Sequence, residues 1–499
     1  MLRSILAVFS GILLSLSFPG FNIWLCAWFG FIPLFFALLN KTKFQAFILS
    51  YLSGVVFWAF TVYWLVHVTL LGTVILVLYL ALYFGFFGVI LSRPGILNNK
   101  FSVVAIPSAW VLLEYARSHL LTGFPWALLA YSQYKNIPLI QFSDITGAWG
   151  VSFLIVMANV ALFSVFLTQE RRVADIAKRL SVPFLCLAVI LAYGYFKISL
   201  ETKAVKPQIL KISLIQGNIP QSLKWKPMAR SFITNKYLAL SREAQETEPD
   251  LIIWPEAAVP FLLGEDRGDF KILVDAARTL KTQLLLGAVS VRNGLYYNSA
   301  LLFSSEGKLA GVYDKVHLVP FGEYIPLKKL LPFLETIAPI GDIERGEDYR
   351  ILRVKNSQTA KQNSLGVLIC FEDLFPEISA KFIREGAEFL VNITNDAWYL
   401  RTSAAEQHLA ASVFRAVESR VNLMRAANTG ITGFISPSGE IISLVRDKRN
   451  NKIFIDGVLT ENIRIIRHKI SPYAQSGDVF IIICAILLLY GIILPLKKQ

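Results

Sequence analysis

The stretch GVLICFEDLFPE, residues 366–377, joins an apolar run to a cysteine, several acidic residues and a proline. The run GVLIC has the composition of a buried strand. Pro376 suits the first position of a helix, where its missing N–H is not needed. A strand that leads into a helix is a building unit of layered α/β folds. The stretch therefore predicts an α/β domain in which Cys370 lies at the end of a strand.

Cys370 has no evident disulfide partner. The chain contains four cysteines, and the other three, Cys26, Cys186 and Cys484, lie inside long apolar stretches. In an oxidising compartment a lone cysteine is either a buried, inert thiol or a residue kept for its reactivity. Taken alone, Cys370 is compatible with both.

The stretch belongs to a globular insert that extends from about residue 205 to 470. Strand-like runs such as DLIIWPE and QLLLGAVSV alternate there with helical patterns such as FKILVDAARTLKT. Such alternation predicts a layered α/β fold, and the insert is long enough to bury its own core. No G-x-G-x-x-G or P-loop motif is present, which argues against a nucleotide-binding domain.

The rest of the chain is strongly apolar. Overall, 55% of the residues are hydrophobic and only 17% are charged, and the mean hydropathy is +0.53. A bilayer span requires about 20 apolar residues. A signal peptide is the competing interpretation of residues 1–18, but no small-residue cleavage site follows, so we expect a retained helix. We predict about eight transmembrane helices, at residues 4–18, 21–39, 45–66, 69–92, 102–119, 150–168, 180–198 and 478–496.

Basic residues lie at alternate ends of successive predicted spans. The positive-inside rule then places both termini in the cytoplasm and the insert on the extracytoplasmic side. We therefore predict a transmembrane domain of about seven helices at 1–200, an α/β domain at 205–470 and a C-terminal transmembrane helix at 478–496. The net charge of +14 is explained by this topology signal and by attraction to anionic lipid, so no nucleic-acid partner is expected.

Three segments of the α/β domain carry polar residues where strands should end. DLIIWPEAAVP contains Glu256, VYDKVHLVPFGEYIP contains Lys315, and GVLIC ends on Cys370. Active sites of layered α/β folds gather at strand ends. If these side chains meet, Glu256 can accept the thiol proton and Lys315 can hold an oxyanion. Taken singly, each residue also has a structural interpretation. Cys370 is then a small buried hydrophobe, Glu256 a turn residue and Lys315 a solvated lysine.

Together the three segments resemble the carbon–nitrogen hydrolase (nitrilase) superfamily, whose members carry a Glu–Lys–Cys triad on an αββα sandwich. With seven predicted spans before the domain and one after it, the whole chain resembles the membrane-bound family of that superfamily, the apolipoprotein N-acyltransferases. The resemblance implies a nitrilase-like catalytic domain at 205–470 with Glu256, Lys315 and Cys370 as its catalytic residues.

The same resemblance implies roles for further residues. Glu323 and Glu372 match supporting positions of the family's site, while Trp225 and Asn298 match positions needed for function, which we interpret as substrate binding. Relatives often have tyrosine directly after the cysteine, where this chain has Phe371. An aromatic ring is retained there, but a phenol hydroxyl is not.

The reaction that the resemblance implies is a two-step acyl transfer in the bacterial inner membrane. Cys370 attacks an acyl ester of a membrane phospholipid and becomes a thioester, and the acyl chain then passes to the α-amino group of a diacylglyceryl-cysteine at the N-terminus of an apolipoprotein. Ping-pong kinetics would follow. We expect a monomer that needs no metal or organic cofactor, and the sequence contains no HExxH or CxxC spacing.

Two other functions are compatible with these motifs. A membrane-tethered amidase would use the same triad and let water attack the thioester, although such hydrolases need no membrane base. A transporter or sensor with an inactive nitrilase-like domain would have lost a triad residue, whereas all three are present.

Three further segments lead to structural expectations. The apolar stretch at 328–346 is either a lid that dips into the bilayer surface or a packed connecting helix. A helix at about 404–424 should bury Arg415, Glu418 and Arg425 in ion pairs behind the site. Glu114 and Arg117, near the end of a predicted span, are expected to snorkel to the membrane surface.

Overall fold

The computed structural model describes residues 1–97, 101–167, 173–201, 208–264, 267–324, 343–465 and 470–493. The lid was expected at 328–346, and most of that stretch, residues 328–342, lies outside the described residues. The chain divides into two compact units. One comprises Met1–Thr202, Thr402–Phe414 and Ser476–Gln499, and the other comprises Lys203–Arg401 and Arg415–Gln475.

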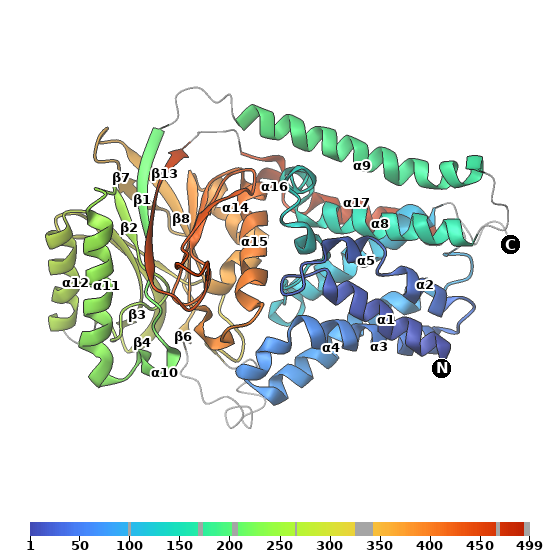
Figure 1. Cartoon of the computed structure of the whole chain (residues 1–499), viewed down its shortest axis with the longest axis horizontal. Helices are drawn as coiled ribbons and strands as arrows, with labels where there is room; N and C mark the ends of the chain where they lie inside the picture. Colours follow the sequence, from blue (N-terminus) through green and yellow to red (C-terminus); the bar gives the residue numbers. More distant parts are fainter. Residues whose placement is uncertain are drawn as a thin grey trace. The chain divides into compact units, whose positions relative to one another are not determined.

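The first unit is helical (Figure 1). Its main helices are α1 (Leu2–Leu16), α2 (Ile32–Leu38), α3 (Lys43–Thr61), α4 (Leu70–Leu91), α5 (Ser102–His119), α8 (Ala148–Phe166), α9 (Val173–Glu201) and α17 (Val479–Ile493). Shorter turns are η1 (Trp24–Trp28), η2 (Tyr63–His67), η3 (Leu120–Thr122), η4 (Leu129–Gln133), α6 (Ile137–Ile140) and α7 (Ser143–Thr146). Each predicted span thus contains helix. Within the described residues, α3, α4, α8 and α9 are long and apolar enough to cross a membrane, and α1, Trp24–Leu38 and α17 are apolar but shorter.

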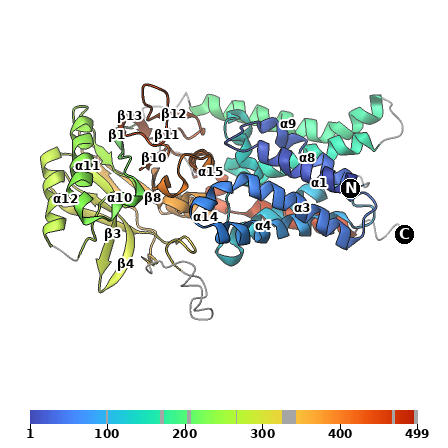
Figure 2. The same ribbon diagram turned by 60° about the horizontal axis from the view of Figure 1, so that its bottom comes forward.

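Helices α3 and α4 lie side by side because small residues allow their backbones to approach (Figure 2). A Cβ on Gly88 of α4 would lie 2.4 Å from the Ala46 carbonyl oxygen of α3, and one on Gly54 would lie 2.7 Å from Phe84 Cβ. Close packing of small residues is the usual basis of helix association in membranes.

The expectation that Glu114 and Arg117 snorkel is wrong. Both are buried in the helical unit, each with 3% of its surface exposed. Glu114 Oε1 accepts the Leu129 N–H at 2.7 Å, and Arg117 donates to the Trp126 carbonyl at 2.9 Å. The chain after α5 folds back over these side chains, so they cap its backbone groups instead of reaching for water.

The second unit contains two β-sheets. In the described residues the first sheet has the order β13-β1-β2-β3-β4-β5, with β6 beside β4, and the second has the order β12-β11-β10-β9-β8-β7. Strands β1, β2 and β3 are parallel, and so are β8, β9 and β10. The first sheet comprises β1 (Gln208–Gln216), β2 (Leu251–Ile253), β3 (Gln283–Arg292), β4 (Leu295–Phe303), β5 (Leu309–Asp314), β6 (Ile343–Glu344) and β13 (Gly457–Ile465). The second comprises β7 (Leu352–Lys355), β8 (Gln362–Ile369), β9 (Phe389–Thr394), β10 (Leu423–Ala427), β11 (Gly433–Ile435) and β12 (Ile441–Leu444).

The two sheets pack face to face, with β1 against β10 and β4 against β8. Helices α11 (Arg230–Gln245) and α12 (Arg267–Leu280) cover the first sheet through a buried apolar cluster, and α14 (Pro376–Arg384) covers the second (Figure 1). The described residues of this unit also form the short helices α10 (Gln221–Lys224), η5 (Pro227–Ala229), η6 (Cys370–Leu374), η7 (Asp396–Tyr399) and α16 (Pro472–Ser476). The layered α/β fold predicted from the alternating strands and helices is therefore present.

Helix α15 (Ala404–Ser419) is shorter than expected. Arg420 has a left-handed φ of +56°, which ends the helix, and Arg425 lies on strand β10. Residues Leu423–Ala427 form strand β10 and pair with β9. The helical pattern of the preceding residues therefore does not continue to Arg425.

Candidate active site

Cys370 follows strand β8 directly and has a left-handed φ of +53°. This conformation costs a residue with a side chain about 1–2 kcal/mol. It turns the chain sharply into η6, after which Pro376 begins α14 as predicted. Asn392 of β9 holds the turn, since its Nδ2 donates to the carbonyls of Leu368 and Cys370, both at 3.1 Å. The cysteine is partly exposed, and none of the four cysteines, all of which lie in the described residues, forms a disulfide bond.

Glu256 lies in the turn after β2 and is 8% exposed. The next residue, Ala257, has a φ of +43°. The turn rests on Gly287 of β3, where a Cβ would lie 2.6 Å from Glu256 Cα and from Ala257 N. Gly287 N–H also donates to the Pro255 carbonyl at 3.2 Å. A glycine at this position is thus required for the glutamate to reach its place.

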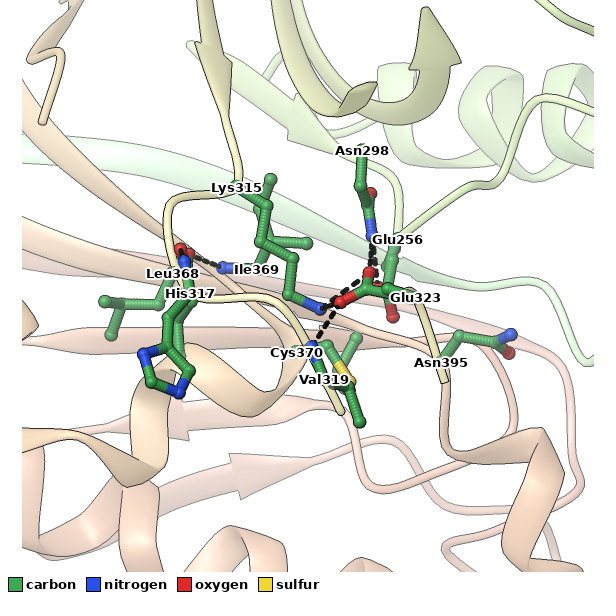
Figure 3. A network of polar contacts seen from close by, with 12 residues as sticks. Glu256, Asn298, Lys315, His317, Val319, Glu323, Leu368, Ile369, Cys370 and Asn395 are labelled. Carbon is green, nitrogen blue, oxygen red and sulfur yellow. Dashed lines mark hydrogen bonds and ion pairs between the residues drawn. The ribbon is translucent and has the colours of Figure 1, made fainter. Parts of the chain in front are cut away.

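Lys315 follows β5 and is 1% exposed. Its Nζ lies 2.9 Å and 2.8 Å from the two oxygens of Glu323 and 3.8 Å from Glu256 Oε1. Asn298 of β4 joins the two carboxylates, because its Nδ2 donates to Glu256 Oε1 and Glu323 Oε1, each at 2.8 Å. Figure 3 shows these four side chains converging, with Cys370 beside them.

Burial, the largest effect, and the charge of Glu256 raise the pKa of the Cys370 thiol well above its ordinary value, and Lys315 opposes them. Lys315 itself has a raised pKa: burial lowers it, but the charges of Glu323 and Glu256 outweigh that effect. These shifts favour a neutral thiol beside a protonated lysine. A thiol with a raised pKa needs a base to take its proton before it can act as a nucleophile.

Glu372 is buried beneath the turn that carries Cys370. Its Oε2 accepts Ile369 N–H at 2.7 Å, and its Oε1 accepts Val316 N–H at 2.7 Å and the Tyr313 hydroxyl at 2.9 Å. It thereby ties the end of β8 to the segment that carries Lys315. Burial raises its pKa to about 7 against the effect of these hydrogen bonds.

Three more predicted or neighbouring residues have clear positions. Phe371 is buried and its ring packs edge-on against Phe375. Trp225 ends the short helix α10 and is 45% exposed. The residue before it, Lys224, is buried, and its Nζ donates to the Glu256 carbonyl at 3.2 Å. Sequence reasoning did not single out Lys224, because a lysine in a polar helix carries no signal of burial.

Buried ion pairs lie behind Cys370, as predicted. Arg425 contacts Asp373 at 3.1 Å and Asp396 at 3.0 Å, and also donates to Asn392 Oδ1 at 2.7 Å. A second pair links Arg415 and Glu418 of α15 at 2.9 Å. Arg425 thus fixes Asn392, which in turn holds the Cys370 carbonyl. Within the described ranges no group of three or more His, Cys, Asp or Glu side chains is arranged to hold a metal ion.

Comparison with known proteins supplies the wider context. The family described as Apolipoprotein N-acyltransferase N-terminal domain matches residues 10–161, and the family Carbon-nitrogen hydrolase matches residues 211–463. The apolipoprotein N-acyltransferase of Geobacter metallireducens is 40% identical, covering 96% of this chain and 92% of that protein. The one of Methylococcus capsulatus is 32% identical, covering 95% and 92%. A solved amidase from Nesterenkonia sp. covers 56% of this chain and 96% of its own, at 18% identity and a TM-score of 0.40, which is too distant to support an argument about activity.

The α/β unit, with its paired sheets and its cysteine-bearing turn, is a carbon–nitrogen hydrolase domain. Because relatives at up to 40% identity match nearly the full length, and the N-terminal helices match their own family, the chain belongs to the apolipoprotein N-acyltransferase family. The resemblance inferred from the motifs is confirmed.

Proposed function

We propose that the chain is an N-acyltransferase that moves an acyl chain from a membrane phospholipid, through a Cys370 thioester, to the α-amino group of the diacylglyceryl-cysteine of an apolipoprotein. The proposal is carried by the cluster in which Lys315 lies 3.8 Å from Glu256 and the charges of both residues shift the pKa of the Cys370 thiol. The chain that holds this cluster belongs to the apolipoprotein N-acyltransferase family. Glu256, Lys315 and Cys370 are the catalytic residues of the proposal.

In the first step the Sγ–H proton passes to Glu256 while the sulfur bonds to the ester carbonyl carbon. The carbonyl oxygen becomes negative and is stabilised by the ammonium of Lys315. When the intermediate collapses, the bond to the glycerol oxygen breaks, and that oxygen takes the proton from Glu256. A lysophospholipid leaves, and the acyl chain stays on Cys370.

In the second step the α-amino group of the acceptor attacks the thioester carbon. Glu256 takes the proton that the amine loses, an amide forms, and the thiol is restored with that proton. Asn298 and Glu323 serve the reaction by holding the Glu256 carboxylate and the Lys315 ammonium in register. Glu372 supports the turn from below. Trp225, exposed beside Lys224, and Phe371 are assigned to substrate contact.

The membrane arrangement is part of the proposal. About eight helices anchor the chain in the bacterial inner membrane, with both termini cytoplasmic and the catalytic domain on the periplasmic side. The division into 1–200, 205–470 and 478–496 follows the apolar stretches. Both substrates are lipid-anchored, and an enzyme in the same membrane meets them by lateral diffusion. The enzyme acts as a monomer without a cofactor.

Intact-protein mass spectrometry tests this function. Wild type and Cys370→Ala are incubated with phospholipid vesicles and no acceptor, and a diacylglyceryl peptide is then added. An acyl mass on the wild type alone, transferred to the peptide amine, supports the transferase. Release of free fatty acid with the peptide unmodified would instead establish a membrane-tethered amidase, and no adduct on either protein would overturn both.

A further inference from the structure

Lys224 is a second buried ammonium near the nucleophile, and the mechanism above does not use it. Only 3% of its surface is exposed. Its one hydrogen bond among the described residues joins Nζ to the Glu256 carbonyl oxygen at 3.2 Å. An ammonium has three N–H donors, so two of them have no protein acceptor in this part of the chain. Burying donors in this way is costly unless a ligand completes them.

The donors of Lys315 are distributed differently. Lys315 Nζ lies 2.9 Å and 2.8 Å from the two carboxylate oxygens of Glu323. It also lies 3.8 Å from Glu256 Oε1. Carboxylates therefore surround the Lys315 ammonium. It supplies positive charge to the site, but its N–H groups are already engaged, whereas those of Lys224 are open.

The surroundings of Lys224 fix where its ammonium lies. The Glu256 carbonyl that receives its hydrogen bond belongs to the turn supported by Gly287. Burial lowers the pKa of Lys224 to about 8, and the charges of Glu256 and Cys370 partly oppose this effect. Both acidic groups of the proposed triad are thus within electrostatic reach of Nζ. The hydrogen bond to the Glu256 carbonyl holds the ammonium beside the turn that carries one member of the proposed triad.

We propose that Lys224 is a further catalytic residue, which donates its open N–H groups to the acyl-donor oxygen that becomes negative when Cys370 is acylated. This inference rests on the proposed function. The bond that forms joins Sγ to the carbonyl carbon, and the electron pair of the C=O bond moves onto the oxygen that Lys224 receives. The thiol proton goes to Glu256 and later to the departing glycerol oxygen, so Lys224 keeps its own protons throughout.

The test is the single-turnover rate of Cys370 acylation in full-length protein mixed with phospholipid vesicles, followed by intact mass. Lys224→Met should slow acylation about 100-fold, the usual effect of removing one oxyanion donor. Lys224→Arg, which keeps N–H donors, should recover at least a tenth of the wild-type rate. Lys226→Met is the matched control, because Lys226 lies two residues away on the surface, and it should behave as wild type.

Two further readouts separate catalysis from folding. Alkylation of Cys370 by iodoacetamide forms no oxyanion, so in Lys224→Met its rate should stay within about threefold of wild type. The thermal unfolding midpoint gives the folded fraction of each variant. If Lys224→Met acylates like wild type per folded molecule, or if alkylation falls as much as acylation, the inference is overturned while the proposed function stands. If wild type itself acquires no acyl group, the proposed function and the inference both fail.

Discussion

Removal of the Asn392 amide should slow the acylation of Cys370 although the cysteine itself is unchanged. In Asn392→Ala, Leu368 and Cys370 lose the donor that reaches their carbonyls at 3.1 Å, and Arg425 loses an acceptor at 2.7 Å. Neutral hydrogen bonds contribute about 1 kcal/mol each and charged ones about 1.5–3 kcal/mol, so unfolding should become about 3–5 kcal/mol easier. The left-handed turn at Cys370, which costs about 1–2 kcal/mol, then loses its restraint.

The consequence for chemistry follows from geometry. A misplacement of about 1 Å costs about 100-fold in rate, so acylation of Cys370 per folded molecule should fall by that factor. The rate is measured by intact mass in a single turnover with phospholipid vesicles. Chemical unfolding of the same detergent-solubilised protein gives the stability.

The matched control is Asn363→Ala, on strand β8 at the end far from Cys370. Asn363 is also buried, accepts from Gln208 at 2.7 Å and donates to Glu388 at 3.1 Å. Its loss should lower stability but leave acylation per folded molecule unchanged. An Asn392→Ala protein that is destabilised as expected yet acylates within threefold of wild type would show that the amide does not position the nucleophile.

Three other outcomes follow from the site. Gly287→Ala places a Cβ 2.6 Å from Glu256 Cα, so single-turnover acylation should fall at least about 100-fold, and normal turnover would contradict the packing argument. Burial raises the pKa of Glu372 from 4.5 to about 7, so the free energy of unfolding of wild type should decline by about 3 kcal/mol as pH rises from 4.5 to 7. Urea unfolding at pH 5 and 8 should show this decline in wild type and not in Glu372→Gln. Lys224 has a pKa of about 8 and interacts electrostatically with Glu256 and Cys370, so acylation should fall as pH rises through 8. Lys224→Arg should keep its rate to about pH 9, and matching pH profiles would exclude this role.

Strand ends explain why much of the site was predictable. Buried runs precede Glu256 and Cys370 in the sequence, and parallel strands deliver their final residues to one edge of a sheet. Pro376 marks the helix start by its own covalent structure. These signals are local, and the structure places each residue at the end of the expected strand.

The meeting of these residues was not predictable from local signals. Glu256 and Lys315 follow strands of the first sheet, whereas Cys370 follows a strand of the second. The site therefore exists only because the two sheets pack face to face. Arg425 shows the same limit of local signals. The apolar pattern before it predicts a helix that continues to about residue 424, whereas pairing with β9 makes the segment that contains Arg425 a strand.

The sequence by itself determined the kind of elements and the chemistry available: apolar helices, an alternating α/β domain, and a glutamate, a lysine and a cysteine at strand ends. Tertiary structure alone decided which charges are buried and what their donors contact. Lys224 and Lys315 are both lysines among polar residues, yet one is surrounded by carboxylates and the other keeps open N–H groups. Periodicity records which side of an element faces the core, but hydrogen bonds and pKa values depend on neighbours far away in the chain, which only folding brings together.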